Sequence, residues 1–418
     1  MISGFSPDSG VAGDGITNSH VVSLTGSAEA NATVNVYDGG TRIGTATANA
    51  GGQWTLATGT LADATHPDAT HSFTATATDV AGRTGGASNT LAVTFDTAAP
   101  VVAITSITDG TGSSFTDLIT KDGVVTLSGS VSDAHGITKV EVFEGTTSLG
   151  TTTVNIGNWT LTTTLAGSGS HTLGVVATDV AGNISGTVST PAITVDTTPP
   201  ALAITSVTDD TGRSFTDRIT KDGLVTLSGT VSDAHGIAKV EVFDGTTSLG
   251  TATVNNNGTW SLSATLASEG SHTLGVVATD IAGNASDTVH TALITVDKTP
   301  PAAPIITSAA DNADPFIGNV ANGGATNDTT PTLGGTAEAN SSVTIYEGTT
   351  ALGTVMADGG GAWSFTTAGL AQGSHSFTAK ATDAAGNQGL ASSSYTVTVD
   401  TTAPTVSEGL FSAPARWR

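Results

Sequence analysis

Acidic residues recur at matching places in four successive segments of this 418-residue chain. An aspartate precedes each Thr- and Pro-containing string of the type ITVDTTPP, and a second aspartate opens each string of the type ATD-x-AG. The first set is Asp96, Asp196, Asp297 and Asp400, and the second is Asp79, Asp179, Asp280 and Asp383. Carboxylate oxygens are the ligands that Ca²⁺ prefers. The pattern therefore raises the possibility of a cation site that is repeated about every 100 residues.

The elements between these aspartates have the period of β-strands. Apolar residues alternate with Thr and Ser in strings such as Leu173, Val175 and Ala177, and Phe377, Ala379 and Ala381 repeat that pattern. Asp-Gly, Asn-rich and Gly-rich turns separate the strings. Each segment holds about seven strands, which is typical of an immunoglobulin-type β-sandwich. The sequence predicts an all-β chain of four such sandwiches in tandem, forming an elongated rod.

The strand order of such a sandwich predicts which carboxylates meet. The last strand leaves one domain beside the loops that join strands two to three and six to seven of the next. We therefore expect three groups, one at each junction: Asp96 with Asp133 and Asp179, Asp196 with Asp233 and Asp280, and Asp297 with Glu338 and Asp383. Close carboxylates repel one another, and Lys and Arg are too few to pair with them. Bound Ca²⁺ would remove the repulsion, whereas the alternative is that these residues only cap turns. A second acidic group, which includes Asp109, Asp117 and Asp122, lies in the first long loop of each central domain and could add ligands.

Four strings resemble the tandem bacterial Ig-like domains of large repetitive surface adhesins, including biofilm-associated proteins exported by type I secretion. These strings are LTGSAEANATVNVYDGG, GGTAEANSSVTIYEGTTALGT, GSHSFTAKATDAAGN and VTVDTTAP. The resemblance covers about residues 5–404. It implies an extracellular or cell-surface location, a row of sandwiches, and calcium near the junctions. The first strand of the first domain is expected to be truncated at Met1.

Composition excludes several other functions. The net charge of −24 disfavours nucleic acid and anionic membrane surfaces, and the absence of cysteine excludes disulfides and thiolate chemistry. No apolar stretch is long enough to insert into a membrane. The histidines recur beside the same neighbours in each segment, as structural residues do, so we expect no enzymatic activity. One tryptophan recurs per segment, and its alternation with leucine favours burial over sugar binding.

We therefore predict domains at residues 1–97, 98–197, 198–298 and 299–401, with a non-repeat tail at 402–418. The predicted function is a calcium-stiffened stalk of a bacterial adhesin that supports cell adhesion and biofilm formation. Its partners would be neighbouring Ig-like repeats of a longer chain, and a host or abiotic surface through a distal domain. The alternative is a spacer or glycan-binding region of a large secreted enzyme that acts on polysaccharides.

Overall fold

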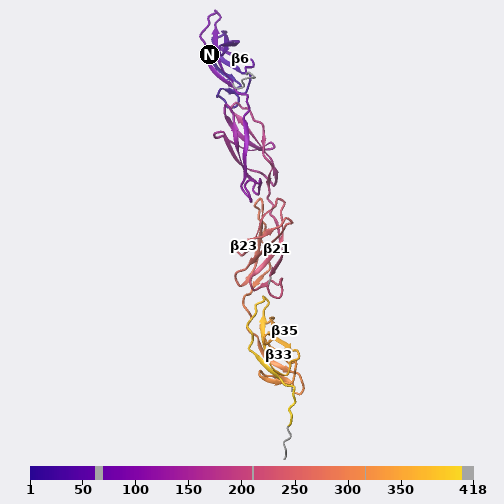
Figure 1. The fold of residues 1–418 in the computed structure, drawn as a ribbon. Helices are drawn as coiled ribbons and strands as arrows, with labels where there is room; N and C mark the ends of the chain where they lie inside the picture. The colour runs from indigo at the N-terminus through magenta and orange to yellow at the C-terminus, as the bar shows by residue number, and fades with distance from the viewer. Residues whose placement is uncertain (62–68, 210, 316, 407–418) are drawn as a thin grey trace, which may run out of the picture. The chain divides into compact units, whose positions relative to one another are not determined.

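The computed structural model describes residues 1–61, 69–209, 211–315 and 317–406. These residues form strands and loops, and the described part of the chain has no helix long and apolar enough to span a membrane. The chain divides into two compact units. The first contains Met1–Pro200 together with the loops Asp233–Ala238 and Thr279–Ala285, and the second contains the remainder. Figure 1 shows successive groups of strands from the indigo N-terminus to the yellow C-terminal part.

Each of the four modules has two main sheets packed together, as the sequence predicts, and the second and third modules add a small third sheet. In the first module one sheet contains β1 (Ile2–Ser6), β3 (Ser23–Ser27) and β6 (Gln53–Ala57). The other sheet has the order β2 (Ile16–Thr17), β8 (Leu91–Phe95), β7 (Thr70–Thr78), β4 (Thr33–Asp38) and β5 (Thr41–Thr47). The first strand, which we expected to be truncated, is β1; it has five residues, against nine in its counterpart β9.

The second and third modules have nearly the same strands. In the second, β14 (Asn158–Thr164), β11 (Val124–Ser132) and β9 (Val101–Asp109) face β13 (Thr147–Thr152), β12 (Ile137–Glu144), β16 (Leu173–Asp179) and β17 (Val188–Ser189). A small third sheet contains β10 (Ile119–Thr120), β18 (Ile193–Val195) and β15 (Gly169–His171).

In the third module, the first sheet has the order β19 (Ala201–Asp209), β21 (Leu224–Ser232), β25 (Thr259–Thr265) and β24 (Thr253–Val254). The second has β23 (Thr247–Thr251), β22 (Ile237–Asp244), β27 (Leu274–Asp280) and β28 (Val289–His290). The small sheet contains β20 (Ile219–Thr220), β29 (Ile294–Val296) and β26 (Gly270–His272).

The fourth module resembles the first. One sheet has the order β31 (Gly318–Val320), β30 (Ile305–Asp311), β33 (Thr332–Thr336) and β36 (Ala362–Thr366). The other has β32 (Gly324–Thr326), β38 (Tyr395–Val399), β37 (Gly373–Thr382), β34 (Ser342–Glu347) and β35 (Thr350–Met356).

The core of each module is thin and built around one tryptophan. Trp54, Trp159, Trp260 and Trp363 are at most 4% exposed, which confirms the predicted burial. A glycine on the neighbouring strand makes room for each ring: a Cβ on Gly129 would lie 2.6 Å from the indole of Trp159. The predicted inward-facing residues Leu173, Val175 and Ala177 are likewise 0% exposed.

A short parallel pair of strands closes the end of each module and positions its exit. In the second module β10 lies parallel to β18, and the amide of Asp196 donates to the Thr120 carbonyl at 2.9 Å. Thr17, Thr220 and Thr326 accept the equivalent bonds from Asp96, Asp297 and Asp400. The aspartate that precedes each Thr- and Pro-containing string is thereby fixed by a hydrogen bond at the exit of its module.

Candidate functional site: the joints between modules

The first joint brings together Asp96 of one module and the β11–β12 turn of the next. Asp96 is fully buried, and its Oδ1 accepts a bond from the Ala98 amide at 3.1 Å. Asp133 in the turn is half-buried and accepts a bond from the amide of His135 at 2.9 Å. Ligand atoms of Asp96, Asp133 and His135 all lie within 4.8 Å of one another. The turn therefore delivers one carboxylate and one imidazole to the buried exit aspartate.

This cluster is electrostatically strained. Burial raises the pKa of the Asp96 carboxyl, and repulsion from Asp133 and Asp179 raises it further. His135 Nδ1 lies 3.2 Å from Asp96 Oδ2, but neither buried atom makes a hydrogen bond among the described residues. A buried polar atom without a partner costs about 1–3 kcal/mol. The joint therefore has unmet capacity for a donor or a cation.

Asp179, the third residue predicted for this joint, serves chiefly its own turn. Its Oδ1 accepts the amide of Asn183 and its Oδ2 accepts the Asn183 side chain, both at 2.8 Å. Asn183 Nδ2 also donates to the Asp96 carbonyl at 2.9 Å. The asparagine thus joins the two modules as a polar clamp, with Asp179 orienting its amide.

The second joint repeats the first, and all of its residues belong to the first compact unit. Ligand atoms of Asp196, Asp233 and His235 lie within 4.8 Å of one another. Here His235 Nδ1 makes a hydrogen bond with Asp196 Oδ2 at 2.9 Å. Asn284 Nδ2 donates to the Asp196 carbonyl and to Asp280 Oδ2, both at 2.8 Å.

The third joint, within the second unit, keeps the clamp but has no histidine. Asn387 Nδ2 donates to the Asp297 carbonyl at 2.7 Å and to Asp383 Oδ2 at 2.9 Å. Loss of hydration raises the pKa of Glu338, and the nearby charges of Asp383 and Asp297 raise it further. The structure therefore brings the three predicted carboxylates within electrostatic reach of one another. Among the described residues, however, only those of the first two joints form a three-ligand group within 4.8 Å.

A second contact at each joint was not predicted from the sequence. The loop after the first strand of one module packs against the Asp-x-Ala-Gly turn of the next. In the first joint the Val11 amide donates to the Val180 carbonyl at 2.8 Å, and Ser9 Oγ donates to the Ala181 carbonyl at 2.7 Å. Between them lies Gly10, where a Cβ would come within 2.0 Å of the Val180 carbonyl oxygen.

The same contact recurs at the other joints, with a lysine added. In the second joint the Ser113 amide donates to the Ile281 carbonyl at 2.9 Å, and Lys121 Nζ donates to the Gly283 carbonyl at 3.1 Å. In the third joint Lys221 Nζ donates to the Gly386 carbonyl at 3.2 Å. The sequence does contain a signal for these loops, because a hydroxyl residue and a glycine recur as Ser9-Gly10, Thr111-Gly112 and Thr211-Gly212.

The second acidic group, which was expected to add ligands, contains one buried and two loop-bound carboxylates. Asp109 is 4% exposed, and neither carboxylate oxygen has a hydrogen-bond partner among the described residues. Burial raises its pKa, and Asp117 raises it further. Asp117 and Asp122 accept bonds within their own loop, from the amides of Ile119 and Val124. Asp109 ends β9, and Asp117 and Asp122 lie in the segment after it, which carries the second contact.

Another set of histidines has a structural role within each sandwich. His171 Nδ1 lies 2.6 Å from Glu144, and its Nε2 lies 3.2 Å from the Gly167 carbonyl. His71, His272 and His375 make the equivalent pairs with Asp38, Asp244 and Glu347. These pairs join the end of one strand to the start of another. His135 and His235, by contrast, face Asp96 and Asp196. This was not predicted, because their recurrence in the sequence indicated structural residues.

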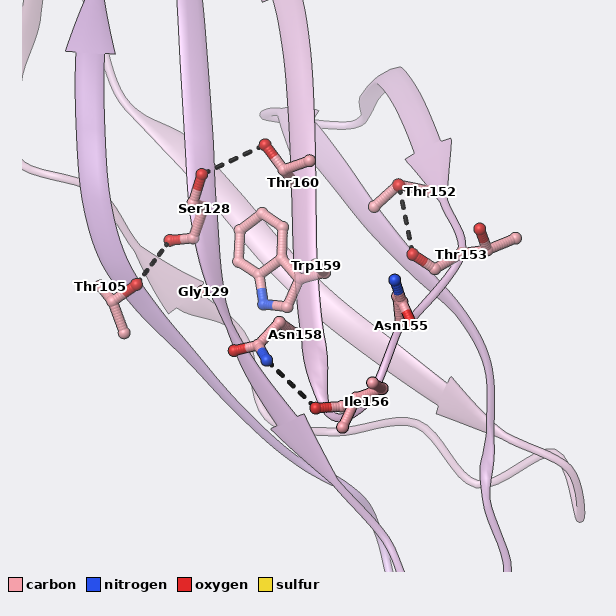
Figure 2. Close-up of a pocket in the computed structure, with 10 residues that line it drawn as sticks. All are labelled: Thr105, Ser128, Gly129, Thr152, Thr153, Asn155, Ile156, Asn158, Trp159 and Thr160. Carbon is pink, nitrogen blue, oxygen red and sulfur yellow. Dashed lines mark hydrogen bonds between the residues drawn. The ribbon is translucent and has the colours of Figure 1, made fainter.

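The alternative function, glycan binding, requires a surface cavity that can hold a sugar. A cavity of about 730 Å³ lies over the β14–β11–β9 sheet (Figure 2). Hydroxyl and amide side chains such as Thr105, Ser128 and Asn155 line it, and the hydroxyls of Ser128 and Thr160 are hydrogen-bonded to each other. Trp159 also borders it but is only 3% exposed. The indole therefore offers no open face on which a sugar could stack.

Comparison with known proteins identifies the modules. The profile of the bacterial Ig-like domain matches residues 3–97, 98–197, 198–298 and 303–401. Domains of this kind are typically non-catalytic. No curated protein matches the chain at a significant level.

Solved structures show only distant similarity. The fibronectin(III)-like modules of Clostridium thermocellum CbhA share 21% identity over 47% of this chain and 94% of theirs, with a TM-score of 0.30. A biofilm-associated protein BSP domain shares 14% identity over 96% of both chains, with a TM-score of 0.19. A Bacteroides ovatus glucan-utilisation protein, SGBP-B, shares 17% over 72% of this chain and 71% of its own, at 0.18. These scores carry no functional argument, whereas the four profile matches cover nearly the whole sequence. The chain belongs to the bacterial Ig-like domain family.

Proposed function

We propose that this chain is a non-enzymatic stalk segment of a bacterial surface adhesin, whose joints bind calcium. The observation that carries the proposal is the recurrence of one polar clamp at all three joints. Asn183, Asn284 and Asn387 each bond the preceding module's exit carbonyl while held by their own aspartate. Repetition of a module-to-module contact supports a mechanical role, since a catalytic site is usually a single constellation.

The carboxylates at the joints fit a hard cation. Calcium would be held by Asp96, Asp133 and Asp179 in the first joint, by Asp196, Asp233 and Asp280 in the second, and by Asp297, Glu338 and Asp383 in the third. Burial raises the pKa of Asp96 and of Glu338, and neighbouring carboxylates raise it further; a bound ion would relieve that second, repulsive part. Asp96 Oδ2, which makes no hydrogen bond among the described residues, also supports this assignment.

The imidazoles at the first two joints do not fit calcium, which takes oxygen ligands. His235 is bonded to the same Asp196 oxygen that the ion would use. A calcium ion would therefore compete with the imidazole for the exit aspartate.

The expected gain is modest. Extracellular modules bind calcium with dissociation constants of roughly 10⁻⁴ to 10⁻³ M. At free calcium about ten times the dissociation constant, each site adds about 1.4 kcal/mol to the stability of the joint. Small-angle scattering and thermal melting of the whole chain, with calcium or with chelator, test this directly. Calcium should sharpen the distribution of intramolecular distances and raise the melting temperature.

Asp196→Ala is expected to abolish the calcium response of the second joint only. Asp287→Ala is the matched control, because it removes an exposed carboxylate of the third module outside the joint. Equal calcium responses of the two variants and the native chain would exclude these ligands. An unchanged scattering profile with and without chelator would remove the ion from the proposal.

The remaining parts of the proposal concern the cell. We place the stalk outside the cell or at its surface, exported by type I secretion, where it holds a distal binding region that supports adhesion and biofilm formation. Antibody against the chain should label intact cells of the producing bacterium. Deletion of the four modules with retention of the flanking sequence should reduce attachment if spacing is their role.

A further inference from the structure

The histidines of the first two joints offer ligand chemistry that the proposed calcium sites do not use. His135 stands two positions after Asp133, and the turn that contains them brings both side chains to Asp96. Calcium takes oxygen ligands, whereas imidazole nitrogen is a common ligand of zinc and other transition-metal ions. The three side chains therefore form a mixed nitrogen and oxygen donor set.

At the first joint two buried donor atoms lie side by side without bonding each other. Asp96 is 0% exposed, and its Oδ2 makes no hydrogen bond among the described residues. His135 Nδ1 is also buried without a hydrogen bond there, although it lies only 3.2 Å from that oxygen. Because the distance suits a hydrogen bond, it is the direction of the two groups that prevents one. Such a pair is arranged to bind a common third atom.

The spacing of these atoms fits one tetrahedral ion. Zinc binds histidine nitrogen and carboxylate oxygen at about 2.0–2.2 Å, which places two of its ligand atoms about 3.3 Å apart. The histidine Nδ1 lies 3.2 Å from the exit carboxylate at the first joint and 2.9 Å at the second. The turn carboxylate lies within 4.8 Å of the other ligand atoms, so it has to approach by about 1.5 Å at most. Asp133 and Asp233 are only half-buried, which leaves room for this movement.

Charge and ligand number favour a transition-metal ion over calcium at these joints. Asp96 and Asp133 together carry two negative charges, which a divalent ion neutralises, and a neutral imidazole adds no charge. Three protein ligands and one water complete a four-coordinate zinc site, whereas calcium takes six to eight oxygens. Asp179, the third proposed calcium ligand, already accepts hydrogen bonds at both of its carboxylate oxygens.

The third joint lacks the nitrogen donor. Glu338 stands where the other two turns have aspartate, and the exposed residue Asn340 stands where they have histidine. Zinc in proteins is bound by cysteine, histidine and carboxylate side chains, and not ordinarily by an amide. The chain thus contains its own comparison, with two joints that have a histidine and one that does not.

We infer that the first two joints bind zinc or a similar transition-metal ion through the exit aspartate, the turn aspartate and the turn histidine. The ligands are Asp96, Asp133 and His135 in the first joint, and Asp196, Asp233 and His235 in the second. The inference rests on the proposed function only in placing a cation at the joints, and here zinc displaces calcium because both use the exit carboxylate. The first joint should bind zinc more tightly, since His235 must give up its hydrogen bond to Asp196.

Equilibrium dialysis of the untagged full chain, followed by metal analysis, tests the inference. Zinc is buffered at about 10 μM, ten times a micromolar dissociation constant, with and without millimolar calcium. Two zinc ions per chain are expected in both media. His135→Asn and His235→Asn, which introduce the residue of the third joint, should each remove one ion, and the double variant should remove both. His290→Asn is the matched control, because His290 is exposed and lies outside the joints.

Imidazole ¹H–¹⁵N spectra of the same samples show which nitrogen binds. Zinc should shift the Nδ1 signals of His135 and His235 and leave that of His290 unchanged, and the amide spectra show that each variant is folded. Absence of bound zinc overturns the inference, and so does zinc that stays bound in the double variant. Zinc that fails to bind while calcium still raises the melting temperature overturns this inference alone. Zinc binding without any calcium response overturns only the calcium proposal.

Discussion

Replacing Gly10 by alanine should loosen the first joint without harming either sandwich. Gly10 has φ +71°, a conformation that costs other residues about 1–2 kcal/mol. The new Cβ would also lie 2.0 Å from the Val180 carbonyl oxygen and 2.6 Å from the Ala181 carbonyl carbon. Both of these neighbours are backbone atoms that cannot rotate away. The loop must therefore leave the turn.

Undocking removes two hydrogen bonds, those of the Val11 amide and of Ser9 Oγ. At about 1 kcal/mol each, the loss is about 2 kcal/mol beyond the backbone strain. Gly13→Ala is the matched control, because Gly13 lies in the same loop at φ +89° with nothing within 4 Å of a Cβ. Gly13→Ala therefore adds backbone strain without a steric clash.

Hydrogen exchange of the Val11 amide measures the opening of the joint directly. An additional 2 kcal/mol corresponds to about thirtyfold faster exchange in Gly10→Ala than in Gly13→Ala. Core amides such as that of Leu127 should exchange alike in the two variants. Equal exchange at Val11 in both would show that the glycine contact does not hold the modules together.

Three further changes test the buried charges. Asp109→Asn should raise the free energy of unfolding measured in denaturant titrations, because the native carboxylate is buried and its pKa is raised. Burial of the charged form destabilises the native chain only as pH rises through that pKa, so the stabilisation by Asp109→Asn should vanish in acid. Burial alone would lower the pKa of His375, but its bonds to the Ala371 carbonyl and to Glu347 raise it above 6.5. The stability from this pair is therefore complete below pH 6.5 and lost as pH rises through the higher folded value, and Glu347→Gln should flatten that dependence in melting curves. Glu338→Gln should stabilise the third joint in chelator and reduce its response to calcium, whereas a ligand-independent effect would appear equally in both media.

The fold was predictable because apolar residues with a period of two, separated by frequent turn sequences, are compatible with few folds other than a β-sandwich. Val140 and Val142 on β12, like Leu173 and Val175 on β16, are fully buried as their alternation requires. The meeting of Asp196 with Asp233 also followed, since strand direction alone decides which loops share an end. Such inferences need only local pattern and topology.

Contacts that depend on the angle between modules were not predictable. The sequence shows a hydroxyl residue and glycine at Thr111-Gly112, but nothing in it says that the Ile281 carbonyl is the partner. His135 gave a fainter signal: it stands two positions after Asp133 in a tight turn, where both side chains can project together. Because this histidine recurs in two modules, we took it for a structural residue within each sandwich. Residues of a joint recur as well, however, since the joint itself is repeated.

The clamps and the proposed ions contribute to the joints in different ways. Asn284 bonds the Asp196 carbonyl whatever the charge of the surrounding carboxylates, and Lys121 and Ser113 add bonds that need no ion. At about 1 kcal/mol for each hydrogen bond, these contacts together exceed the roughly 1.4 kcal/mol expected from one calcium. Chelation should therefore soften a joint without opening it. Asn284→Ala removes one of these hydrogen bonds while those of Lys121 and Ser113 remain, so it should loosen the second joint by a similar amount in calcium and in chelator.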